Sequence, residues 1–286
     1  MDSWRCIINM NLTAAWKVPV EEGDIHIQAY GMNHDVPVML LHGTAAYHYC
    51  WRSVAAQLAS QYRVYCPDLL GYGVSDKPRT VLYSKQAQAK RIQAVIEALD
   101  CEAVHLVGHS MGGEIAAHIA LQSPHLLRSL TLVAPGGFRR GVASPVKWAA
   151  RKGWMDGIFR GAMNRKMKPT TLARMLSLPL VHITPEFMDS WTKPYQDPNT
   201  PFVIAKTLAD DDTGIIAHRI SEIHVPTLLI YGTIDKMIPK QVFRQYEQTV
   251  PNLCTELYDD SGHVLMEECP DRLAASIQSF IVRCCP

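Results

Sequence analysis

Short apolar runs alternate with helix-length amphipathic segments along most of this chain, and this rhythm restricts the folds that it can adopt. The apolar runs are rich in β-branched residues and mostly end at Gly, Pro or Asp: 36–41, 62–66, 104–107, 130–133, 227–231 and 254–258. Such runs are typical of strands buried on both faces of a parallel sheet. Segments with helical spacing separate or follow them: 51–60, 85–99, 113–122, 240–249 and 271–282. This alternation predicts an α/β three-layer sandwich with a mostly parallel sheet.

One long stretch interrupts the rhythm. Residues 136–224 contain no convincing strand, whereas 146–161 and 169–178 show helical spacing and prolines recur around them. We therefore expect a helical cap (lid) at 136–224, inserted into a core domain formed by 1–135 and 225–286. Near the N-terminus, residues 24–31 predict an antiparallel hairpin partner at the N-terminal edge of the sheet.

Composition excludes several classes of protein. The 286 residues carry 28 Lys+Arg against 27 Asp+Glu, so the whole chain is not a nucleic-acid-binding polycation. The first residues lack the apolar stretch of a secretory signal, and no apolar run approaches the length of a membrane span. The eight cysteines include no C-x-x-C pair. We expect a cytoplasmic protein with no nucleic-acid partner and no stable insertion into a membrane.

The near-neutral total charge conceals a strongly basic segment. Residues 139–174 contain ten basic side chains and one acidic side chain, Asp156. Because this segment belongs to the expected cap, it is either a solvated helix face or a surface that steers an anionic substrate. Such a substrate would be a carboxylate, a coenzyme A or carrier-protein thioester, or an anionic lipid surface. Interleaved apolar residues are expected to form the underside of the cap over the pocket, as cap core in preference to a face that dips into a membrane. Trp148 and Trp154 are candidate substrate-binding residues among them.

The sequence GHSMGG at 108–113 lies directly between a predicted strand and a predicted helix. In that context a G-x-S-x-G pattern predicts a sharp strand-to-helix turn that exposes the serine above the carboxyl edge of the sheet. The flanking glycines remove the Cβ atoms that would clash in such a turn. We predict that Ser110 is a nucleophile at the positive end of the following helix.

A serine hydroxyl needs a base to accept its proton, and twelve histidines compete for that role. His263 follows the last predicted strand and precedes the last predicted helix, which places it at the same sheet edge as Ser110. Asp235 lies just past the preceding strand, where it can orient the imidazole and stabilise its charged form. The chain order Ser110, Asp235, His263 is the order expected for a catalytic triad on this architecture.

These motifs resemble those of the α/β-hydrolase superfamily, in particular esterase-like and lipase-like serine hydrolases with a helical cap, over nearly the whole chain. The residues that carry the resemblance are HGT at 42–44, DLLGYGVSDKP at 68–78, the Ser110 turn, Asp235 and Gly262-His263. The resemblance implies an α/β-hydrolase fold in which the cap roofs the active site and shapes the choice of substrate.

The same resemblance implies an oxyanion hole formed by two backbone N–H groups. In this family one belongs to the residue after the nucleophile, here Met111. The other comes from the loop after the His-Gly pair, here Thr44, with Ala45 as the alternative. His42 is expected to fix that loop, and the 68–78 motif is expected to be mainly structural.

Two further residues are candidates for substrate binding. Tyr47 lies beside the expected oxyanion loop, where it either lines the pocket or packs the loop. His109 directly precedes the nucleophile, and in turns of this kind the residue points away from the face of the serine. A structural role is therefore the competing interpretation for both.

The identity of the nucleophile restricts the reaction. Haloalkane dehalogenases and epoxide hydrolases of this fold use an aspartate where this chain has Ser110. A serine predicts attack on a carbonyl and an acyl-serine that is hydrolysed by a water activated by His263. We expect hydrolysis of an ester, thioester or lactone of a small-molecule substrate, without a metal or cofactor.

Other chemistries remain open alternatives. Carbon–carbon hydrolases often carry Trp directly after the catalytic histidine, and Val264 stands there. Met111 also fits cofactor-free perhydrolases. Some proteins of this fold keep the triad and act as small-molecule receptors, lyases or cyclases.

Overall fold

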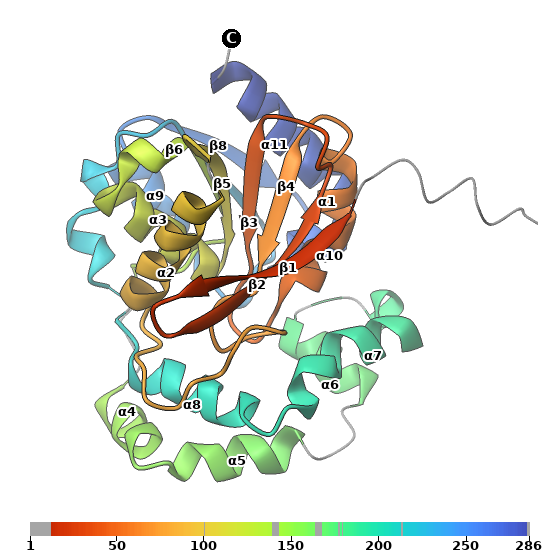
Figure 1. Cartoon of the computed structure of the whole chain (residues 1–286), viewed down its shortest axis with the longest axis vertical. Coiled ribbons are helices and arrows are strands. Elements are labelled where there is room, and N and C mark those ends of the chain that lie inside the picture. The colour runs from red at the N-terminus through yellow and green to blue at the C-terminus, as the bar shows by residue number, and fades with distance from the viewer. Residues whose placement is uncertain are drawn as a thin grey trace, which may run out of the picture.

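The computed structural model describes residues 13–99, 101–138, 143–163, 168–176, 178, 180–212 and 214–284. An eight-stranded sheet with the order β1-β2-β4-β3-β5-β6-β7-β8 forms its centre (Figure 1). The strands are β1 (Ala14–Val20), β2 (Gly23–Tyr30), β3 (Pro37–Leu41), β4 (Arg63–Pro67), β5 (Val104–His109), β6 (Leu127–Val133), β7 (Thr227–Gly232) and β8 (Leu253–Tyr258). β2 pairs antiparallel with β1 and with β4, and the strands from β4 to β8 pair in parallel.

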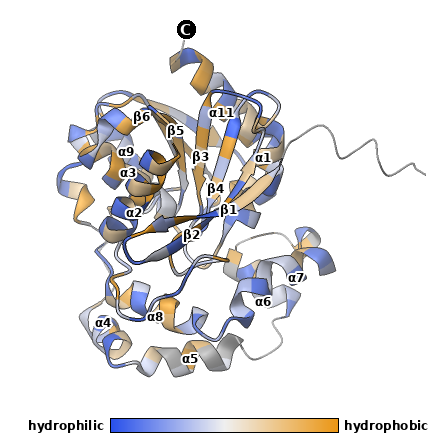
Figure 2. Ribbon diagram, in the orientation of Figure 1, coloured by the Kyte–Doolittle hydropathy of each residue, from blue (hydrophilic) through white to orange (hydrophobic). Residues whose placement is uncertain are grey.

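Helices cover both faces of this sheet. They are α1 (Arg52–Leu58), α2 (Lys85–Ala98), α3 (Met111–Gln122), α9 (Lys240–Thr249), α10 (Leu265–Glu268) and α11 (Pro270–Cys284). Figure 1 shows α2, α3 and α9 on one side and α1 and α11 on the other. Hydrophobic residues concentrate in the central strands between these layers (Figure 2), as burial on both faces requires. The predicted α/β sandwich is confirmed. The expected antiparallel hairpin is formed by β2 with β1, whose range was not predicted and which lies at the edge of the sheet.

A group of helices fills the connection between β6 and β7. We call residues 136–224 the helical segment; it contains α4 (Ser144–Arg151), α5 (Trp154–Met163), α6 (Pro169–Leu176), α7 (Pro185–Thr192) and α8 (Thr200–Ala209). The continuous helical spacing over 146–161 is divided at Gly153, whose φ of +76° ends α4 in the left-handed region. We did not predict α7 or α8 from the sequence, because each has a proline in its first turn and prolines often mark the end of a helix. At the first turn, however, proline is well tolerated, since the N–H that it lacks has no partner within the helix there.

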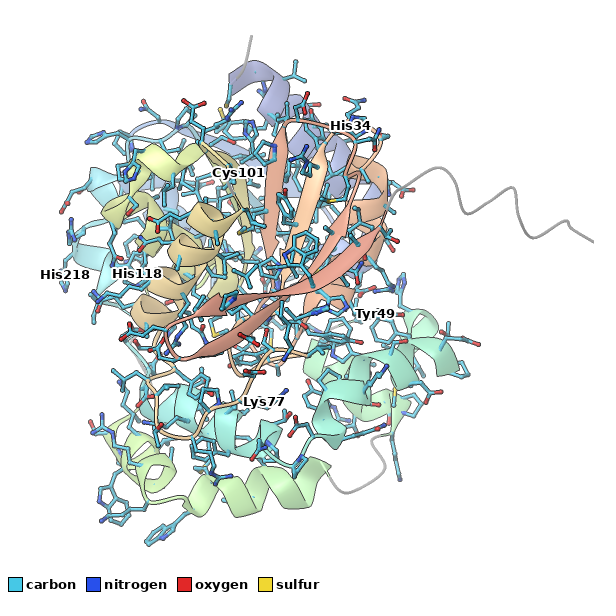
Figure 3. The ribbon with its side chains drawn as sticks, in the orientation of Figure 1. His34, Tyr49, Lys77, Cys101, His118 and His218 are labelled. Carbon is cyan, nitrogen blue, oxygen red and sulfur yellow. The ribbon has the colours of Figure 1, made fainter. Side chains whose placement is uncertain are left out.

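Acidic residues at the end of α8 attach the helical segment to the start of α2. The Asp210 carboxylate accepts a hydrogen bond from the Tyr83 N–H at 2.9 Å, and the Asp212 carboxylate accepts one from the Lys85 N–H at 3.0 Å. The Lys85 ammonium binds the Asp211 carboxylate. Elsewhere Lys77, labelled in Figure 3, forms an ion pair with Asp197 at 3.2 Å. These contacts fix the helical segment on the core.

The register of the parallel strands brings several loops to one edge of the sheet. Leu41 pairs with Gly108, His109 with Val133, and Gly232 with Tyr258, each at the carboxyl end of its strand. The residues that follow β3, β5, β7 and β8 therefore emerge side by side. Among the described helices, none is both long and apolar enough to cross a bilayer.

Candidate active site

Ser110 occupies the strained turn between β5 and α3. Its backbone has φ +54° and ψ −117°, a conformation that residues with a side chain rarely adopt. The turn is tight: a Cβ on Gly108 would lie 2.3 Å from the Gly112 carbonyl oxygen, and one on Gly112 would lie 2.6 Å from the His42 carbonyl oxygen. The Ser110 N–H donates to the Val133 carbonyl at 3.0 Å. Strain held in this way by surrounding contacts is typical of functional positions.

Asp235 and His263 form a buried hydrogen-bonded pair. His263 Nδ1 donates to Asp235 Oδ2 at 2.8 Å, while Asp235 Oδ1 accepts the N–H groups of Met237 at 2.7 Å and Ile238 at 2.9 Å. Both side chains are almost fully shielded from solvent. Because the proton on Nδ1 is engaged by the carboxylate, Nε2 is the nitrogen available to accept a proton.

Ser110 and His263 line the same cavity, whose volume is about 570 Å³. Its walls come from the loops at the carboxyl edge of the sheet and from the helical segment, and most of the side chains are apolar. The apolar wall is formed by Ala45, Ala46, Cys50, Met111, Leu172, Leu176, Trp191, Leu208, Met237, Ile238, Val264 and Met266. Such a cavity suits an apolar substrate that reaches the serine.

The loop after β3 approaches the nucleophile, and His42 anchors it. Thr44 and Met111 both line the cavity, and Thr44 Oγ1 lies 3.3 Å from Met111 Sδ. His42 Nδ1 donates to the Gly43 carbonyl at 2.8 Å, and His42 Nε2 accepts the Leu69 N–H at 3.0 Å. Burial lowers the pKa of His42, which keeps the ring neutral and able to make both bonds.

Tyr195, in the helical segment, also holds this loop. Its hydroxyl donates to the Ala45 carbonyl oxygen, and Ala45 has a φ of +59°. Burial raises the pKa of Tyr195, so the phenol keeps its proton and remains a donor. The sequence assigned Tyr195 no part in this loop, because no local pattern connects residues 150 positions apart.

Glu268 and His109 fix the backbone around His263. The Glu268 carboxylate accepts the Gly262 N–H at 2.6 Å and the Val264 N–H at 3.1 Å. His109 Nε2 donates to the His263 carbonyl at 2.9 Å. Burial and the nearby His263 hold the pKa of His109 far below its usual value, so its ring stays neutral. The loop that carries His263 is thus bound on three backbone groups.

Sequence reasoning missed Glu268, and no capping pattern pointed to it. A capping box has Ser or Thr at the cap and a Glu or Gln three residues later. Here Val264 caps α10 and Glu268 lies four residues after it, so only the structure shows that this carboxylate binds the Val264 N–H.

The structure moves three predicted substrate-binding residues away from the cavity. The Tyr47 hydroxyl donates to the Ser190 carbonyl at 2.6 Å, between the core and α7, and Tyr47 is not in the cavity wall. Trp148 and Trp154 are 50% and 61% exposed and touch edge to face on the outer surface. They point outward because α4 and α5 pack on α8 through other faces. Of the four candidates only His109 lines the cavity.

A cluster of charges forms another part of the cavity wall. Lys85 Nζ contacts the Asp211 carboxylate and lies 3.9 Å from Glu114 Oε2, and all three residues line the cavity. Glu114 follows Ser110 by one turn of α3. Among the described basic residues between 143 and 174, none lines the cavity, so its lining ammonium comes from the core.

One further group in the described ranges has the composition of a metal site. His26, His48 and Asp68 place potential ligand atoms within 4.8 Å of one another. The buried Asp68 carboxylate already accepts the N–H groups of His48 at 2.7 Å and Val74 at 2.8 Å and contacts the His48 ring. Burial opposes its charge, but the hydrogen bond from His48, the electrostatic interactions with His48 and His42 and the Val74 N–H together outweigh it and lower the pKa of Asp68. These contacts make Asp68 a scaffold for the loops of the 68–78 motif.

Comparison with known proteins identifies the family. A sequence profile described as the alpha/beta hydrolase fold matches residues 36–270, which is most of the chain. The chain belongs to the α/β-hydrolase family. This agrees with the motifs in the sequence and with the sheet topology. Membership of the family supports hydrolase activity in general, without a particular substrate.

Curated α/β-hydrolase relatives have diverse activities. The uncharacterized hydrolase YugF of Bacillus subtilis is 26% identical over 258 residues, covering 85% of this chain and 89% of that protein. The 2-hydroxymuconate semialdehyde hydrolase of Pseudomonas sp. is 26% identical over 255 residues, covering 86% of each. Lipase 1 of Psychrobacter immobilis is 27% identical over 246 residues, covering 85% of this chain and 76% of the lipase.

Solved structures show the same fold. A bacterial membrane phospholipase A is 24% identical, with a TM-score of 0.76 over 95% of this chain and 86% of that one. The epoxide hydrolase CorEH is 20% identical, with a TM-score of 0.79 over 95% of this chain and 99% of that one. At these identities the likeness establishes the α/β-hydrolase fold alone.

Proposed function

We propose that this α/β hydrolase cleaves carboxylic esters of apolar substrates through an acyl intermediate on Ser110. The observation that carries the proposal is that Ser110, in its strained turn, and His263, which is hydrogen-bonded to the buried Asp235, line one mostly apolar cavity. A serine nucleophile with an oriented histidine performs acyl transfer.

In the first half of the reaction, His263 Nε2 takes the Ser110 proton as Oγ attacks the ester carbonyl. The imidazolium is stabilised by Asp235, whose orientation is fixed by the Met237 and Ile238 N–H groups. His263 then donates this proton to the leaving alcohol, and the acyl group remains on Ser110. In the second half, a water that His263 deprotonates attacks the acyl group and restores the serine.

The developing oxyanion needs preorganised donors. We assign them to the backbone N–H groups of Met111 and Thr44, because both residues border the cavity beside Ser110. The N-terminus of α3 adds the positive end of its dipole at the same place. Loss of one such donor in comparable enzymes reduces kcat by roughly 100- to 1,000-fold.

The cavity favours a neutral ester over a substrate with a buried anionic group. Glu114 and Asp211 contribute two carboxylates to the wall; the Lys85 ammonium pairs with both, and Lys147, which is not in the cavity wall, lies 3.6 Å from Asp211 Oδ2. Because both ammonium groups already pair with carboxylates of the protein, an anionic substrate group would have to compete for them in a partly desolvated site. The sequence-based expectation of an anionic or coenzyme A-linked substrate therefore finds no support in the described part of the cavity.

Carbon–carbon bond hydrolysis is the second candidate, because a 2-hydroxymuconate semialdehyde hydrolase is among the relatives. Such substrates carry a carbonyl that Ser110 can attack in the same way, with His263 as the base. Rates of hydrolysis measured on an ester and on a diketone of the ring-fission type, with the same protein preparation, distinguish the two candidates.

The proposal is tested with a fluorophosphonate probe and a series of p-nitrophenyl esters of increasing acyl length. The wild-type protein should be labelled and should hydrolyse the esters, whereas Ser110→Ala should lose both activities. Ser60→Ala, at an exposed serine, is the matched control and should behave as wild type. Labelling that persists in Ser110→Ala, or a labelled protein that cleaves none of the esters, contradicts the proposal.

A further inference from the structure

The outermost helices of the helical segment expose large apolar side chains. Trp148 on α4 and Trp154 on α5 are 50% and 61% exposed, and Ile158 on α5 is 61% exposed. The two indole rings meet edge to face with their centroids 4.8 Å apart. Trp154 and Ile158 are four residues apart and share one face of α5. We call these three residues the tryptophan patch.

The patch lies at one extremity of the molecule. α4 and α5 pack against α8 and against each other, and Figure 1 shows them along the edge farthest from the C-terminus. None of the three side chains is in the wall of the substrate cavity. These three large apolar side chains are exposed to solvent outside the site. Such exposure indicates a surface that binds a membrane or another molecule.

Two exposed cations adjoin this patch along the chain. Arg151 and Lys152, which lie between the two tryptophans in the sequence, are exposed, and neither forms an ion pair within the described part of the chain. The segment 139–174 as a whole contains ten basic residues and one acidic residue. Tryptophan beside arginine and lysine on a short amphipathic surface helix is the composition that binds at the headgroup level of anionic bilayers.

We propose that the tryptophan patch, with Arg151 and Lys152, adsorbs this protein to anionic lipid surfaces. The indoles and Ile158 enter the boundary between headgroups and acyl chains, and the two cations remain among the lipid phosphates. A second copy of the chain fits this surface less well, because a symmetric contact would bring the same cations face to face. The binding is peripheral and independent of catalysis.

Vesicle flotation tests this proposal with the full-length protein. It should bind vesicles of phosphatidylcholine mixed with phosphatidylglycerol, bind phosphatidylcholine alone much more weakly, and detach from the mixed vesicles as ionic strength rises. Arg151→Glu with Lys152→Glu should weaken binding by at least 25-fold, since each cation near an anionic surface contributes roughly fivefold. Binding should also shift the tryptophan fluorescence to shorter wavelength.

The apolar part of the patch is tested by Trp148→Ser with Trp154→Ser. This variant should bind about tenfold more weakly, the change expected from loss of roughly 60 Å² of buried apolar surface. Val282→Ser is the matched control, because Val282 is 60% exposed but lies near the C-terminus, at the other end of the molecule. Hydrolysis of a short soluble ester should be unchanged in all of these variants.

Ser110→Ala separates this inference from the proposed function, because an inactive protein should bind vesicles as the wild type does. Equal binding to neutral and anionic vesicles, absence of binding, or binding unaffected by the tryptophan substitutions would overturn the inference. A tryptophan-dependent dimer in analytical ultracentrifugation, without vesicle binding, would assign the patch to a second copy and overturn it equally.

Discussion

Glu268 binds the backbone on both sides of His263. Its two carboxylate oxygens accept the N–H groups of Gly262 and Val264, at 2.6 Å and 3.1 Å. The imidazole that we propose as the catalytic base is therefore held both through Asp235 and through the loop from which it projects. A base that moves by about an ångström can cost roughly 100-fold in rate.

Glu268→Gln is expected to lower kcat by about tenfold with little change in KM, because one of the two oxygens that accept the Gly262 and Val264 N–H groups becomes an NH2 donor. Glu267→Gln is the matched control on the same helix, since Glu267 binds Arg52 at 2.6 Å and not the His263 loop. That control should lose stability and retain kcat. The pH profile of kcat/KM should change in Glu268→Gln and not in Glu267→Gln. If kcat is unchanged in Glu268→Gln, then Glu268 does not position His263.

Tyr195→Phe is expected to lower kcat by about tenfold, because the Ala45 carbonyl loses its donor and the adjoining Thr44 N–H loses its fixed direction. Tyr47→Phe removes a hydrogen bond of the same kind, from Tyr47 to the Ser190 carbonyl at 2.6 Å, between the same two parts of the molecule. The Tyr47→Phe variant should have a lower free energy of unfolding and an unchanged kcat. Steady-state kinetics on a short ester compare the two variants, and similar kinetic losses would show that both tyrosines act only by attaching the helical segment.

Lys85→Met should destabilise the protein by about 3–5 kcal/mol, because it removes the ammonium that the carboxylates of Asp211, Asp212 and Glu114 share, and only Lys147 then stays beside Asp211, at 3.6 Å. Lys206→Met removes a more exposed ammonium, which pairs with Asp210 at 2.8 Å, and should cost less, because the Asp210 carboxylate keeps the hydrogen bond from the Tyr83 N–H. Urea unfolding monitored by tryptophan fluorescence measures both free energies. Equal losses would mean that the charge cluster in the cavity wall contributes no more to stability than the single Lys206–Asp210 pair.

Acid should weaken the fold partly through His105. Burial, with a smaller contribution from the charge of Arg128, lowers the pKa of His105 to about 4. The unfolded chain, with a histidine pKa of about 6.5, therefore binds more protons between pH 6.5 and about 4, and the free energy of unfolding falls as the pH decreases through this range. A single proton contributes at most about 1.4 kcal/mol per pH unit.

His105→Asn tests this dependence, because asparagine can still bond the Ser129 hydroxyl, which lies 2.8 Å from His105 Nδ1, but does not titrate. Urea unfolding of both proteins across this pH range should show a shallower decrease for the variant. Parallel curves would exclude His105, since the other buried histidines are common to both proteins.

The sequence was sufficient for those parts of this protein that depend on local patterns. Alternating apolar runs and amphipathic segments determined the α/β sandwich, because each strand between two layers must be apolar on both faces. The GHSMGG turn between a strand and a helix placed Ser110 at the carboxyl edge, and parallel register requires the loops with Asp235 and His263 to emerge there too. Chain order and strand ends are local information, and the family followed from them.

Only the tertiary structure decided which faces of the helical segment point outward and which distant residues support the site. Helical spacing shows that α4 and α5 have an apolar face, but their packing on α8 determined that Trp148 and Trp154 face solvent rather than the cavity. The bond from Tyr195 to Ala45 depends on how two separate parts of the chain pack. No local pattern contains such contacts, because they arise from burying surfaces that are far apart in sequence.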